Sequence, residues 1–411
     1  MRGAEAVVVG GGPSGMIAAE HLASAGIQVT VIEHMATAGR KLLIAGRGGL
    51  NLTHSEPLDE LLGRYRNAPA QLLEAIRSFT PADLAAWCES LGQPTFVGTS
   101  GRIFPTALRA TPLLRAWLDR LHRLGVQFRL GHRYVGVDGA GGGVLVHTAD
   151  GLIAIEAGVT VLALGGATWP RTGSDGGWVE SLERVGVLVN NLRAANSGFG
   201  VPWSEHFRQR FAWQPLKNVR LTFGSRSVRG EAMITDAGIE GGVVYALSAE
   251  LREAIERDGV AELVIDLHPD ISDAQLQTRL QSARRDDSSA TRLRRAGLSA
   301  VAIGLLRETA TGDGGAKSLR LRLTFVAPMA RAISTAGGIA WSEVDDSFML
   351  RRLPGVFVAG EMLDWEAPTG GYLLQGCFST GVAAAAGARR WLRDHRLEPV
   401  TDQPVTDQPG S

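Results

Sequence analysis

Apolar and polar positions at the start of the chain follow the pattern of a βαβ unit. The apolar stretch Ala6–Val9 predicts a strand, Ser14–Ser24 predicts a helix, and Ile27–Ile32 predicts a second strand. Glycines separate the first strand from the helix. This order of elements is typical of an α/β domain with a parallel sheet.

The rest of the first half continues to alternate between helical and strand patterns. Residues 36–55 are expected to form a polar, glycine-rich loop. Helices are predicted at 58–66, at 70–91 with a restart at Pro81, and at 113–124, and strands of one small sheet at 126–130, 134–138 and 144–148. The continuous apolar run 159–164 ends at Gly165 and Gly166, as expected of a buried parallel strand.

The pattern changes near residue 190. Prolines, arginines and short alternating strands such as 219–223 replace the earlier pattern of apolar strands followed by glycines. An arginine-rich helical stretch is predicted at 273–306, and another buried strand at 356–359 precedes Gly360. We therefore expect one α/β domain interrupted by an insertion. The expected boundaries are 1–190 for its first part, 191–333 for the insert, 334–397 for its closing part and 398–411 for a disordered tail.

Composition narrows the functional classes. Forty-two basic and forty-two acidic residues cancel, so no global field favours nucleic acid or an acidic membrane. The two cysteines, Cys88 and Cys377, lie far apart, which argues against a disulfide framework or a metal site. No signal peptide or membrane-spanning run is recognisable, so a cytoplasmic location is expected.

A nucleotide-binding fingerprint occupies the first βα turn. Gly10, Gly12 and Gly15 fit GxGxxG between a strand and a helix, and the acid Glu33 ends the next strand. The first glycine permits a tight turn, the second lets a pyrophosphate approach the backbone, and the third permits close packing of the helix. The helix N-terminus at Pro13 and Ser14 offers unpaired N–H groups to phosphate. The fingerprint alone does not choose between FAD and NAD.

The segment GRKLLIAGRGGLNLT, residues 39–53, resembles the corresponding loop of the HI0933-like, or YhiN-like, flavoproteins, relatives of the glutathione-reductase-type FAD proteins. In that family the loop runs along the FAD pyrophosphate towards the flavin, which implies FAD as the cofactor here. Family members often carry cysteine where this chain has Leu50, so thiol chemistry at that position is excluded.

Segments far downstream resemble the same family. They are Gly165–Thr168, the closing strand with Gly360 and Glu361, and the helix start Gly370–Gln375. The family's insertions form a small β-barrel with a helical appendage, so the resemblance implies a discontinuous Rossmann-type FAD domain carrying such an insert. The residues expected to bind FAD are Gly10, Gly12, Pro13, Ser14, Gly15, Glu33, Gly39, Arg40, Lys41, Gly48, Asn51, Thr53, Gly165, Gly166, Thr168, Gly360, Glu361, Gly371, Tyr372, Leu373, Leu374 and Gln375.

The reaction is less defined than the cofactor. We expect an FAD-dependent oxidoreductase that acts on a small organic molecule, such as one with a conjugated double bond. Because the sequence has no second GxGxxG after a strand, we expect NAD(P)H to reduce the flavin directly. The alternatives are an RNA-directed flavoprotein related to tRNA-modifying enzymes, which would bind RNA through the arginine-rich helices, and a non-catalytic flavin redox sensor. His54 and residues 364–366 are candidate pocket residues, but no catalytic residue, substrate or oligomeric state is assigned.

Overall fold

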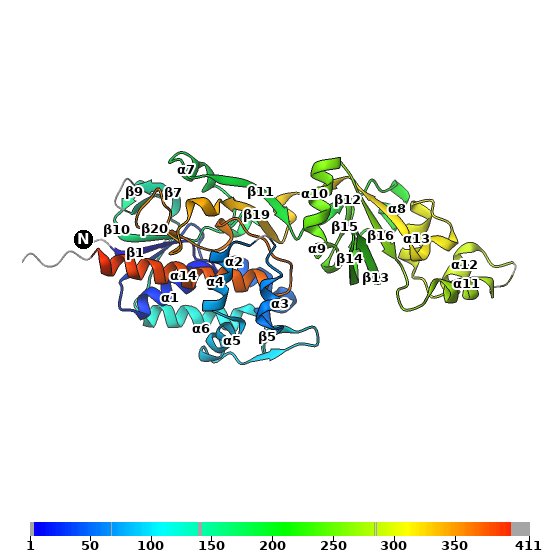
Figure 1. Ribbon diagram of the computed structural model, residues 1–411, viewed down its shortest axis with the longest axis horizontal. Coiled ribbons are helices and arrows are strands. Elements are labelled where there is room, and N and C mark those ends of the chain that lie inside the picture. Colours follow the sequence, from blue (N-terminus) through cyan, green and yellow to red (C-terminus); the bar gives the residue numbers. More distant parts are fainter. Residues whose placement is uncertain (1–3, 67, 139–141, 283, 285, 396–411) are drawn as a thin grey trace, which may run out of the picture.

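Two separate hydrophobic cores organise the chain. The computed structural model describes residues 4–66, 68–138, 142–282, 284 and 286–395, so the tail expected at 398–411 lies outside the described residues. One core draws on residues 6–189 and 339–388, and the other lies within residues 199–323. Figure 1 shows the corresponding lobes side by side along the long axis of the molecule. We call them the parallel-sheet lobe and the insert.

A five-stranded parallel sheet forms the centre of the first lobe. Its order is β20 (Val356–Val358), β10 (Ala157–Leu162), β1 (Ala4–Val9), β2 (Val29–Glu33) and β6 (Gln127–Leu130). The prediction that residues 126–130 belong to a small sheet is wrong, because β6 pairs in parallel with β2. The small sheet contains β7 (Arg133–Asp138), β8 (Gly143–Thr148) and β9 (Gly151–Ile155), which are antiparallel.

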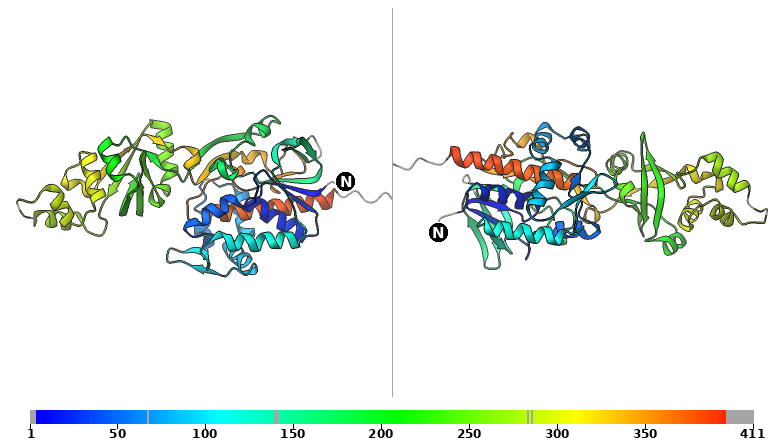
Figure 2. Two further views of the ribbon diagram at one scale, coloured as in Figure 1. Left: turned by 180° about the vertical axis from the view of Figure 1, so that it is seen from behind. Right: turned by 90° about the horizontal axis from the view of Figure 1, so that it is seen from below.

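Helices from both ends of the chain cover one face of this sheet. They are α1 (Pro13–Ser24), α6 (Ala110–Arg123) and α14 (Tyr372–Asp394). Figure 1 and the left-hand view of Figure 2 show them together below the strands. The helix α14 packs directly on α1, because a Cβ at Gly381 would lie 2.5 Å from the carbonyl oxygen of Ser14. The C-terminal segment is thereby fixed beside the first βα turn.

Residues 36–55 are more ordered than the expected loop. They contain α2 (Arg40–Ala45), a 3-10 turn η1 (Gly46–Gly48) and β3 (Thr53–His54). The six residues of α2 all have good or moderate helix propensity, and Gly39 before them adopts φ +72°. Nearby elements are α3 (Leu58–Leu62), α4 (Ala70–Ser78), α5 (Pro81–Ser90), β4 (Thr95–Val97) and β5 (Arg102–Pro105). The helix α7 (Val179–Glu183) lies elsewhere and packs against β7.

The insert contains one curled antiparallel sheet. Its order is β17 (Leu319–Leu323), β16 (Ala261–Asp266), β13 (Pro215–Phe223), β14 (Arg226–Ile234), β15 (Gly238–Glu240), β12 (Phe199–Gly200) and β18 (Phe325–Val326). Only Thr324 separates the two outermost strands, so one nearly continuous segment pairs with β16 at one edge and with β12 at the other. The sheet therefore closes on itself as a small barrel.

Helices complete the insert. They are α8 (Glu205–Phe211), α9 (Gly242–Tyr245), α10 (Ser248–Asp258), α11 (Asp273–Gln281), α12 (Ser289–Arg295) and α13 (Ala300–Glu308). The helical stretch predicted at 273–306 is thus three helices. Ser272, Ser288 and Ser299 each cap a new N-terminus with the side-chain hydroxyl, which explains the restarts.

The lobes are joined by a two-stranded ribbon, β11 (Val189–Ala195) with β19 (Ser334–Ile339), and by a buried ion pair. Arg252 of α10 is 1% exposed and donates to both carboxylate oxygens of Glu366, at 2.9 and 3.0 Å, and to the carbonyl oxygen of Ala194. Within the described residues, no helix has the length and hydropathy to span a membrane. The same residues contain no cluster of side chains suited to a metal ion.

Candidate functional site

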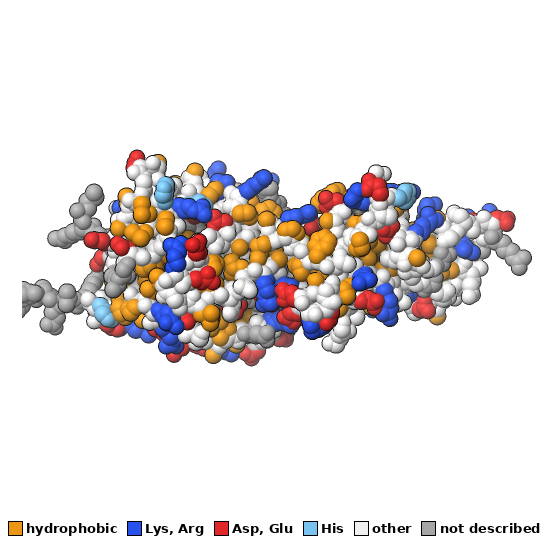
Figure 3. Space-filling model, turned by 90° about the horizontal axis from the view of Figure 1, so that it is seen from above, with side chains coloured by type: hydrophobic (Ala, Val, Ile, Leu, Met, Phe, Trp, Pro, Cys, Tyr) orange, Lys and Arg blue, Asp and Glu red, His pale blue; other side chains and the backbone are white. Residues whose placement is uncertain are grey.

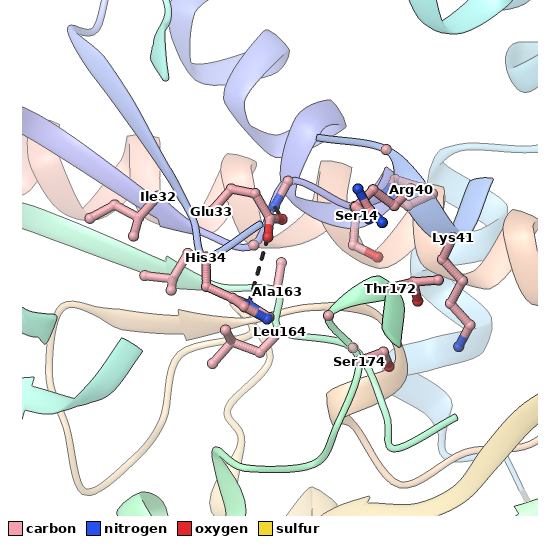
Figure 4. A pocket seen from close by; sticks show the side chains of 18 of the residues that line it. Ser14, Ile32, Glu33, His34, Arg40, Lys41, Ala163, Leu164, Thr172 and Ser174 are labelled. Carbon is pink, nitrogen blue, oxygen red and sulfur yellow. Dashed lines mark hydrogen bonds and ion pairs between the residues drawn. The ribbon is translucent and has the colours of Figure 1, made fainter. Parts of the chain in front are cut away.

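A cleft opens at the carboxyl ends of β1, β2 and β10, where ligands of open α/β sheets bind. It is lined by Val9, Gly10, Gly11, Gly12, Pro13, Ser14, Ile32, Glu33, His34, Thr37, Gly39, Arg40, Lys41, His132, Tyr134, Ala163, Leu164, Gly165, Thr172, Gly173, Ser174, Glu361 and Cys377. Figure 4 shows α2 contributing Arg40 and Lys41 on one side, and the segment with Thr172 and Ser174 facing them. The structure therefore brings together Gly10, Gly12, Pro13, Ser14, Glu33, Gly39, Arg40, Lys41, Gly165 and Glu361 from the residues predicted to bind FAD.

The three fingerprint glycines meet different constraints. Gly10 has φ +110°, and a Cβ there would lie 2.2 Å from the carbonyl oxygen of Ala163. A Cβ at Gly15 would lie 2.0 Å from the carbonyl oxygen of Gly10. At Gly12 the φ is −85°, and an added Cβ would meet no atom within 4 Å. Gly10 and Gly15 are therefore required by the fold, whereas Gly12 leaves space at the N-terminus of α1.

The carboxylate of Glu33 is fixed by hydrogen bonds to the first βα turn and to the residue after His34. The carboxylate accepts hydrogen bonds from the backbone N–H groups of Gly11, at 2.9 Å, and Met35, at 2.8 Å. Each oxygen uses one of its lone pairs in this way, and the side chain remains partly exposed to the cleft. The carboxylate is thus held in a fixed orientation with acceptor capacity left for hydroxyl groups of a ligand.

The basic side chains of Arg40 and Lys41, both from α2, lie at the other wall of the cleft. Lys41 Nζ donates to Glu361 Oε2 at 2.8 Å and to Thr168 Oγ1 at 2.6 Å. Glu361 also accepts from the backbone N–H of Thr335, at 3.1 Å. Contacts between α2, the end of β20 and the turn after β10 thereby connect three of the segments on which the predicted site depends.

The turn after β10 depends on close backbone packing. A Cβ at Gly166 would lie 2.1 Å from Thr335 Oγ1, which accepts from the backbone N–H of Ala167. Gly165 has φ +73°, and its carbonyl oxygen accepts from the indole N–H of Trp178. Thr168 is fully buried. Gly166 and Thr168 therefore support the cleft wall without lining it.

The remaining predicted residues do not line the cleft, and those around Thr53 and Gln375 contact one another instead. Thr53 Oγ1 donates to Gln375 Oε1 at 2.7 Å, and Gln375 Nε2 donates to the carbonyl oxygen of Phe79 and to Ser379. Gly371 has φ +98°, with Thr53 backbone atoms 2.5–2.7 Å from an added Cβ. The remaining predicted residues are Gly15, Gly48, Asn51, Thr53, Gly166, Thr168, Gly360, Gly371, Tyr372, Leu373, Leu374 and Gln375, none of which lines the cleft. The amide oxygen and the amide nitrogen of Gln375 are thus both hydrogen-bonded within the protein.

A polar cluster surrounds the start of α14. Tyr372 donates its hydroxyl to Glu56 at 2.7 Å, and Glu56 also pairs with Arg64 at 2.6 Å. The His54 ring stacks on Tyr372, and its two nitrogens contact the backbone at Ser100 and Glu56. Burial and the bond to Glu56 raise the pKa of Tyr372 well above its usual range, so its phenol stays protonated. His54 is thus part of a structural network.

The other candidate pocket residues have structural partners. Asp364 accepts from the amide of Asn190, Trp365 donates to the carbonyl oxygen of Gly360, and Glu366 binds Arg252. The cleft residues outside the predicted set include Gly11, His34, Thr37, His132, Tyr134, Ser174 and Cys377. Of these, Gly11 and His34 adjoin the fingerprint and its acid, a signal available in the sequence, whereas the others reach the cleft through tertiary packing.

Cys377 lies on α14 at the edge of the cleft. Burial and the nearby Glu361 raise the pKa of its thiol to about 12, so the thiol stays neutral at physiological pH. Cys88 is also a free, buried thiol. Neither has the lowered pKa expected of a redox or nucleophilic cysteine.

Unpartnered polar atoms test whether a dinucleotide suits these residues. Arg40 Nε and Ser174 Oγ line the cleft, are buried and have no hydrogen-bond partner within the described chain. Asn51 Oδ1, on the segment expected to approach the flavin, is in the same state. A buried polar atom without a partner costs about 1–3 kcal/mol. A polar ligand would satisfy these atoms, so the residues present fit FAD.

Comparisons with known proteins agree with this geometry. A family model, HI0933-like protein Rossmann domain, matches residues 4–387. A 3-dehydro-bile acid delta(4,6)-reductase from Clostridium scindens is 25% identical over 93% of this chain and 98% of its own length. A ribosomal RNA dihydrouridine synthase from Escherichia coli strain K12 is 24% identical over 93% of this chain and 97% of its own.

Solved structures share the architecture at lower identity. A 3-ketosteroid delta1-dehydrogenase from Sterolibacterium denitrificans has a TM-score of 0.55 and 13% identity, over 95% of this chain and 99% of its own. A flavocytochrome c3 fumarate reductase has a TM-score of 0.51 and 16% identity, over 95% and 78% of the two chains. These likenesses establish the fold, a Rossmann-type domain with an insert.

Proposed function

The chain belongs to the HI0933-like family and is an FAD-dependent oxidoreductase. We propose that it transfers a hydride from NADH or NADPH, through FAD, to a small organic substrate. The observation that carries this proposal is the cleft at the carboxyl ends of the parallel strands, with open space at Gly12 and fixed acceptors on Glu33. The adenosine ribose would bind Glu33, and the pyrophosphate would lie on the N-terminus of α1.

The cations and unpaired donors of the cleft would complete the FAD site. Arg40, whose Nε is buried without a partner, would donate to the pyrophosphate, and Ser174 would donate its hydroxyl to the same cofactor. Asn51 would contact the flavin with its free Oδ1, and the start of α14 would place backbone N–H groups near the ring. The positive end of that helix would favour the reduced, anionic state of the cofactor.

The two curated relatives suggest the class of substrate. The names of these relatives, a bile acid delta(4,6)-reductase and a dihydrouridine synthase, both describe reduction of a carbon–carbon double bond that is conjugated to a carbonyl group. We extend this shared chemistry to the present chain. Bound FAD would supply the hydride that such a bond accepts at its electron-poor carbon. The sequence contains no second GxGxxG after a predicted strand, as a separate nicotinamide domain would require, which supports direct reduction of the flavin by NAD(P)H.

RNA as a substrate is the second candidate, and the Escherichia coli relative favours it. Exposed arginines on α11 and α12, including Arg294 and Arg295, would supply contacts to phosphate. The balanced charge of the chain argues against it, and Figure 3 shows basic and acidic side chains interspersed over one whole face. Binding of RNA that weakens steeply with salt would favour this candidate, whereas binding insensitive to salt, or none, would count against it.

An anaerobic experiment tests the leading proposal. The purified holoprotein is mixed with NADH or NADPH in a stopped-flow instrument while flavin absorbance is followed, and a conjugated enone is then added. We expect rapid bleaching with at least one nicotinamide, and reoxidation when the enone is added. Bleaching by neither nicotinamide would contradict the proposed donor, and reduced flavin that no enone reoxidises would contradict the proposed class of acceptor.

A further inference from the structure

The two basic residues at the start of α2 differ in whether their charge is compensated. Lys41 Nζ lies 2.8 Å from Glu361 Oε2, and 28% of the lysine side chain is exposed. Arg40 pairs with no carboxylate of the described residues, and its Nε is buried without a hydrogen bond. A cation that is already paired attracts a further anion weakly. Arg40 is therefore available to a phosphate group, whereas Lys41 needs another explanation.

A closed ring of contacts fixes Lys41 and Glu361. Lys41 Nζ also donates to Thr168 Oγ1 at 2.6 Å, and Thr168 is fully buried. Glu361 Oε1 accepts from the backbone N–H of Thr335 at 3.1 Å. Thr335 Oγ1 accepts in turn from the N–H of Ala167, the residue before Thr168. The ring joins α2, the turn after β10, β19 and the turn after β20, so both charged side chains keep a fixed orientation.

Glu361 is held in the same way as Glu33. Each oxygen of Glu33 accepts from one backbone N–H group, that of Gly11 or that of Met35. Each oxygen of Glu361 also accepts from one donor, but one of these donors is the ammonium group of Lys41. The two glutamate side chains are 13% and 12% exposed, and both line the cleft. Each carboxylate therefore keeps acceptor capacity for a hydroxyl group of a ligand.

The two carboxylates lie on opposite sides of the N-terminus of α1. Glu33 bonds to the backbone of the glycine turn before the helix. Glu361 follows Gly360, where an added Cβ would lie 2.3 Å from Ser14 Oγ in the first turn of the helix. Figure 4 shows Ser14 between Glu33 and Lys41. A pyrophosphate on this N-terminus would therefore have one carboxylate on each side, as the ribose and the ribityl chain of FAD flank its pyrophosphate.

We propose that Lys41 is a positioning residue for FAD, which acts through Glu361 and not through the pyrophosphate. Its ammonium group holds the Glu361 carboxylate in place to accept hydrogen bonds from the ribityl hydroxyl groups, whereas Arg40 donates to the pyrophosphate. This inference rests on FAD as the cofactor of the proposed function. It does not depend on the proposed hydride donor or on the class of substrate.

Calorimetric titration of the full-length apoprotein with FAD and with ADP tests this division of roles. ADP carries the adenosine and the two phosphates of FAD but lacks the ribityl chain and the flavin. Lys41→Met should raise the dissociation constant for FAD about tenfold or more and leave that for ADP within about threefold of the wild type, because only FAD reaches Glu361. Arg40→Met should weaken the binding of both ligands by about the same factor.

A double-mutant cycle separates positioning from an independent contact with the cofactor. If Lys41 acts through Glu361, Glu361→Gln should cause the same selective loss of FAD affinity. The double variant K41M/E361Q should then bind FAD no more than about threefold more weakly than the weaker single variant, because the second change removes nothing further. If Lys41 instead contacts the pyrophosphate by itself, the two losses should multiply.

Two further variants control for charge and for stability. Lys41→Arg should recover FAD affinity to within about threefold of the wild type, because a guanidinium group can keep the ion pair with Glu361. Lys317→Met is the matched control, because Lys317 Nζ lies 2.8 Å from Asp266 Oδ2 in the insert, a similar ion pair outside the cleft. Circular dichroism of each apoprotein reports whether it folds.

A selective loss of FAD affinity in Lys41→Met but not in Lys317→Met, with a non-additive cycle and recovery in Lys41→Arg, supports the proposal. Equal weakening of FAD and ADP, unchanged FAD affinity, a Lys41→Met apoprotein that does not fold, losses that multiply, or no recovery in Lys41→Arg would each overturn it. If the affinities change as expected but NADH and NADPH both fail to reduce the flavin, the proposed donor fails while the role of Lys41 stands.

Discussion

Replacing Gly12 by valine should separate cofactor binding from folding. At this position φ is −85° and ψ is 179°, a region that valine favours, and no atom lies within 4 Å of an added Cβ. Because Gly12 is also the N-cap of α1, where glycine is preferred to valine, we expect the free energy of unfolding of the apoprotein to fall by no more than about 1 kcal/mol. The added methyl groups would occupy the space through which a pyrophosphate reaches the N–H groups of α1.

The expected loss of affinity follows from those hydrogen bonds. Hydrogen bonds to a charged group contribute about 1.5–3 kcal/mol each. Losing two of them costs about 3–6 kcal/mol, which corresponds to a roughly 10²- to 10⁴-fold rise in the dissociation constant for FAD. The assay is fluorescence titration of apoprotein with FAD, with circular dichroism as the measure of folding.

Gly15→Ala is the matched control for this prediction. Its Cβ would lie 2.0 Å from the carbonyl oxygen of Gly10, so this smaller substitution should destabilise the fold that Gly12→Val leaves intact. A Gly12→Val protein that binds FAD like the wild type would refute the placement of the pyrophosphate. A Gly12→Val apoprotein that fails to fold would refute the claim that the space is open.

Three further predictions concern other parts of the molecule. Glu33→Ala should weaken FAD binding by about 1–3 kcal/mol in the same titration, because ribose hydroxyls lose their acceptor, and unchanged affinity would contradict this role. Glu366→Ala should lower the free energy of unfolding by about 3 kcal/mol in a urea titration, because it leaves the buried Arg252 with only the more distant carboxylate of Glu256, 4.0 Å away, and a loss below about 1 kcal/mol would contradict that account. The raised pKa values of Cys88 and Cys377, about 12 against an ordinary 9.0, favour the native state below pH 9.0, and this stability is lost as pH rises towards 12. Iodoacetamide should therefore label native protein slowly at mildly alkaline pH and urea-unfolded protein rapidly, and equal rates would contradict the burial of both thiols.

The first βα turn could be predicted from sequence because its determinants are local. The fingerprint glycines, the following helix and Glu33 lie within one βαβ unit, and the family resemblance and the Rossmann-type fold with a barrel insert are confirmed. By contrast, strand β6 was predicted in the wrong sheet. Four residues of mixed polarity do not specify a partner strand, since pairing depends on how distant segments pack.

Side chains that reach the cleft through tertiary packing left no signal in the sequence. Ser174 faces the cleft because the chain after Gly165 turns back on itself, and Cys377 lies there because Gly381 lets α14 contact α1. Gln375 is the opposite case, because the sequence predicted a cofactor contact that the cleft does not show. Its position shortly after a glycine pair suggested that contact, but its side chain is hydrogen-bonded to Thr53, Phe79 and Ser379. Which of the predicted residues touch FAD stays a prediction.

The identity of the released cofactor tests the central claim most directly. Protein purified without added flavin is denatured, and the supernatant is separated by liquid chromatography against FAD and FMN standards. The account predicts a yellow protein that releases FAD in about equimolar amount, as expected if the cleft at the first βα turn binds one dinucleotide. Release of FMN, or a colourless protein that added FAD does not reconstitute, would contradict it.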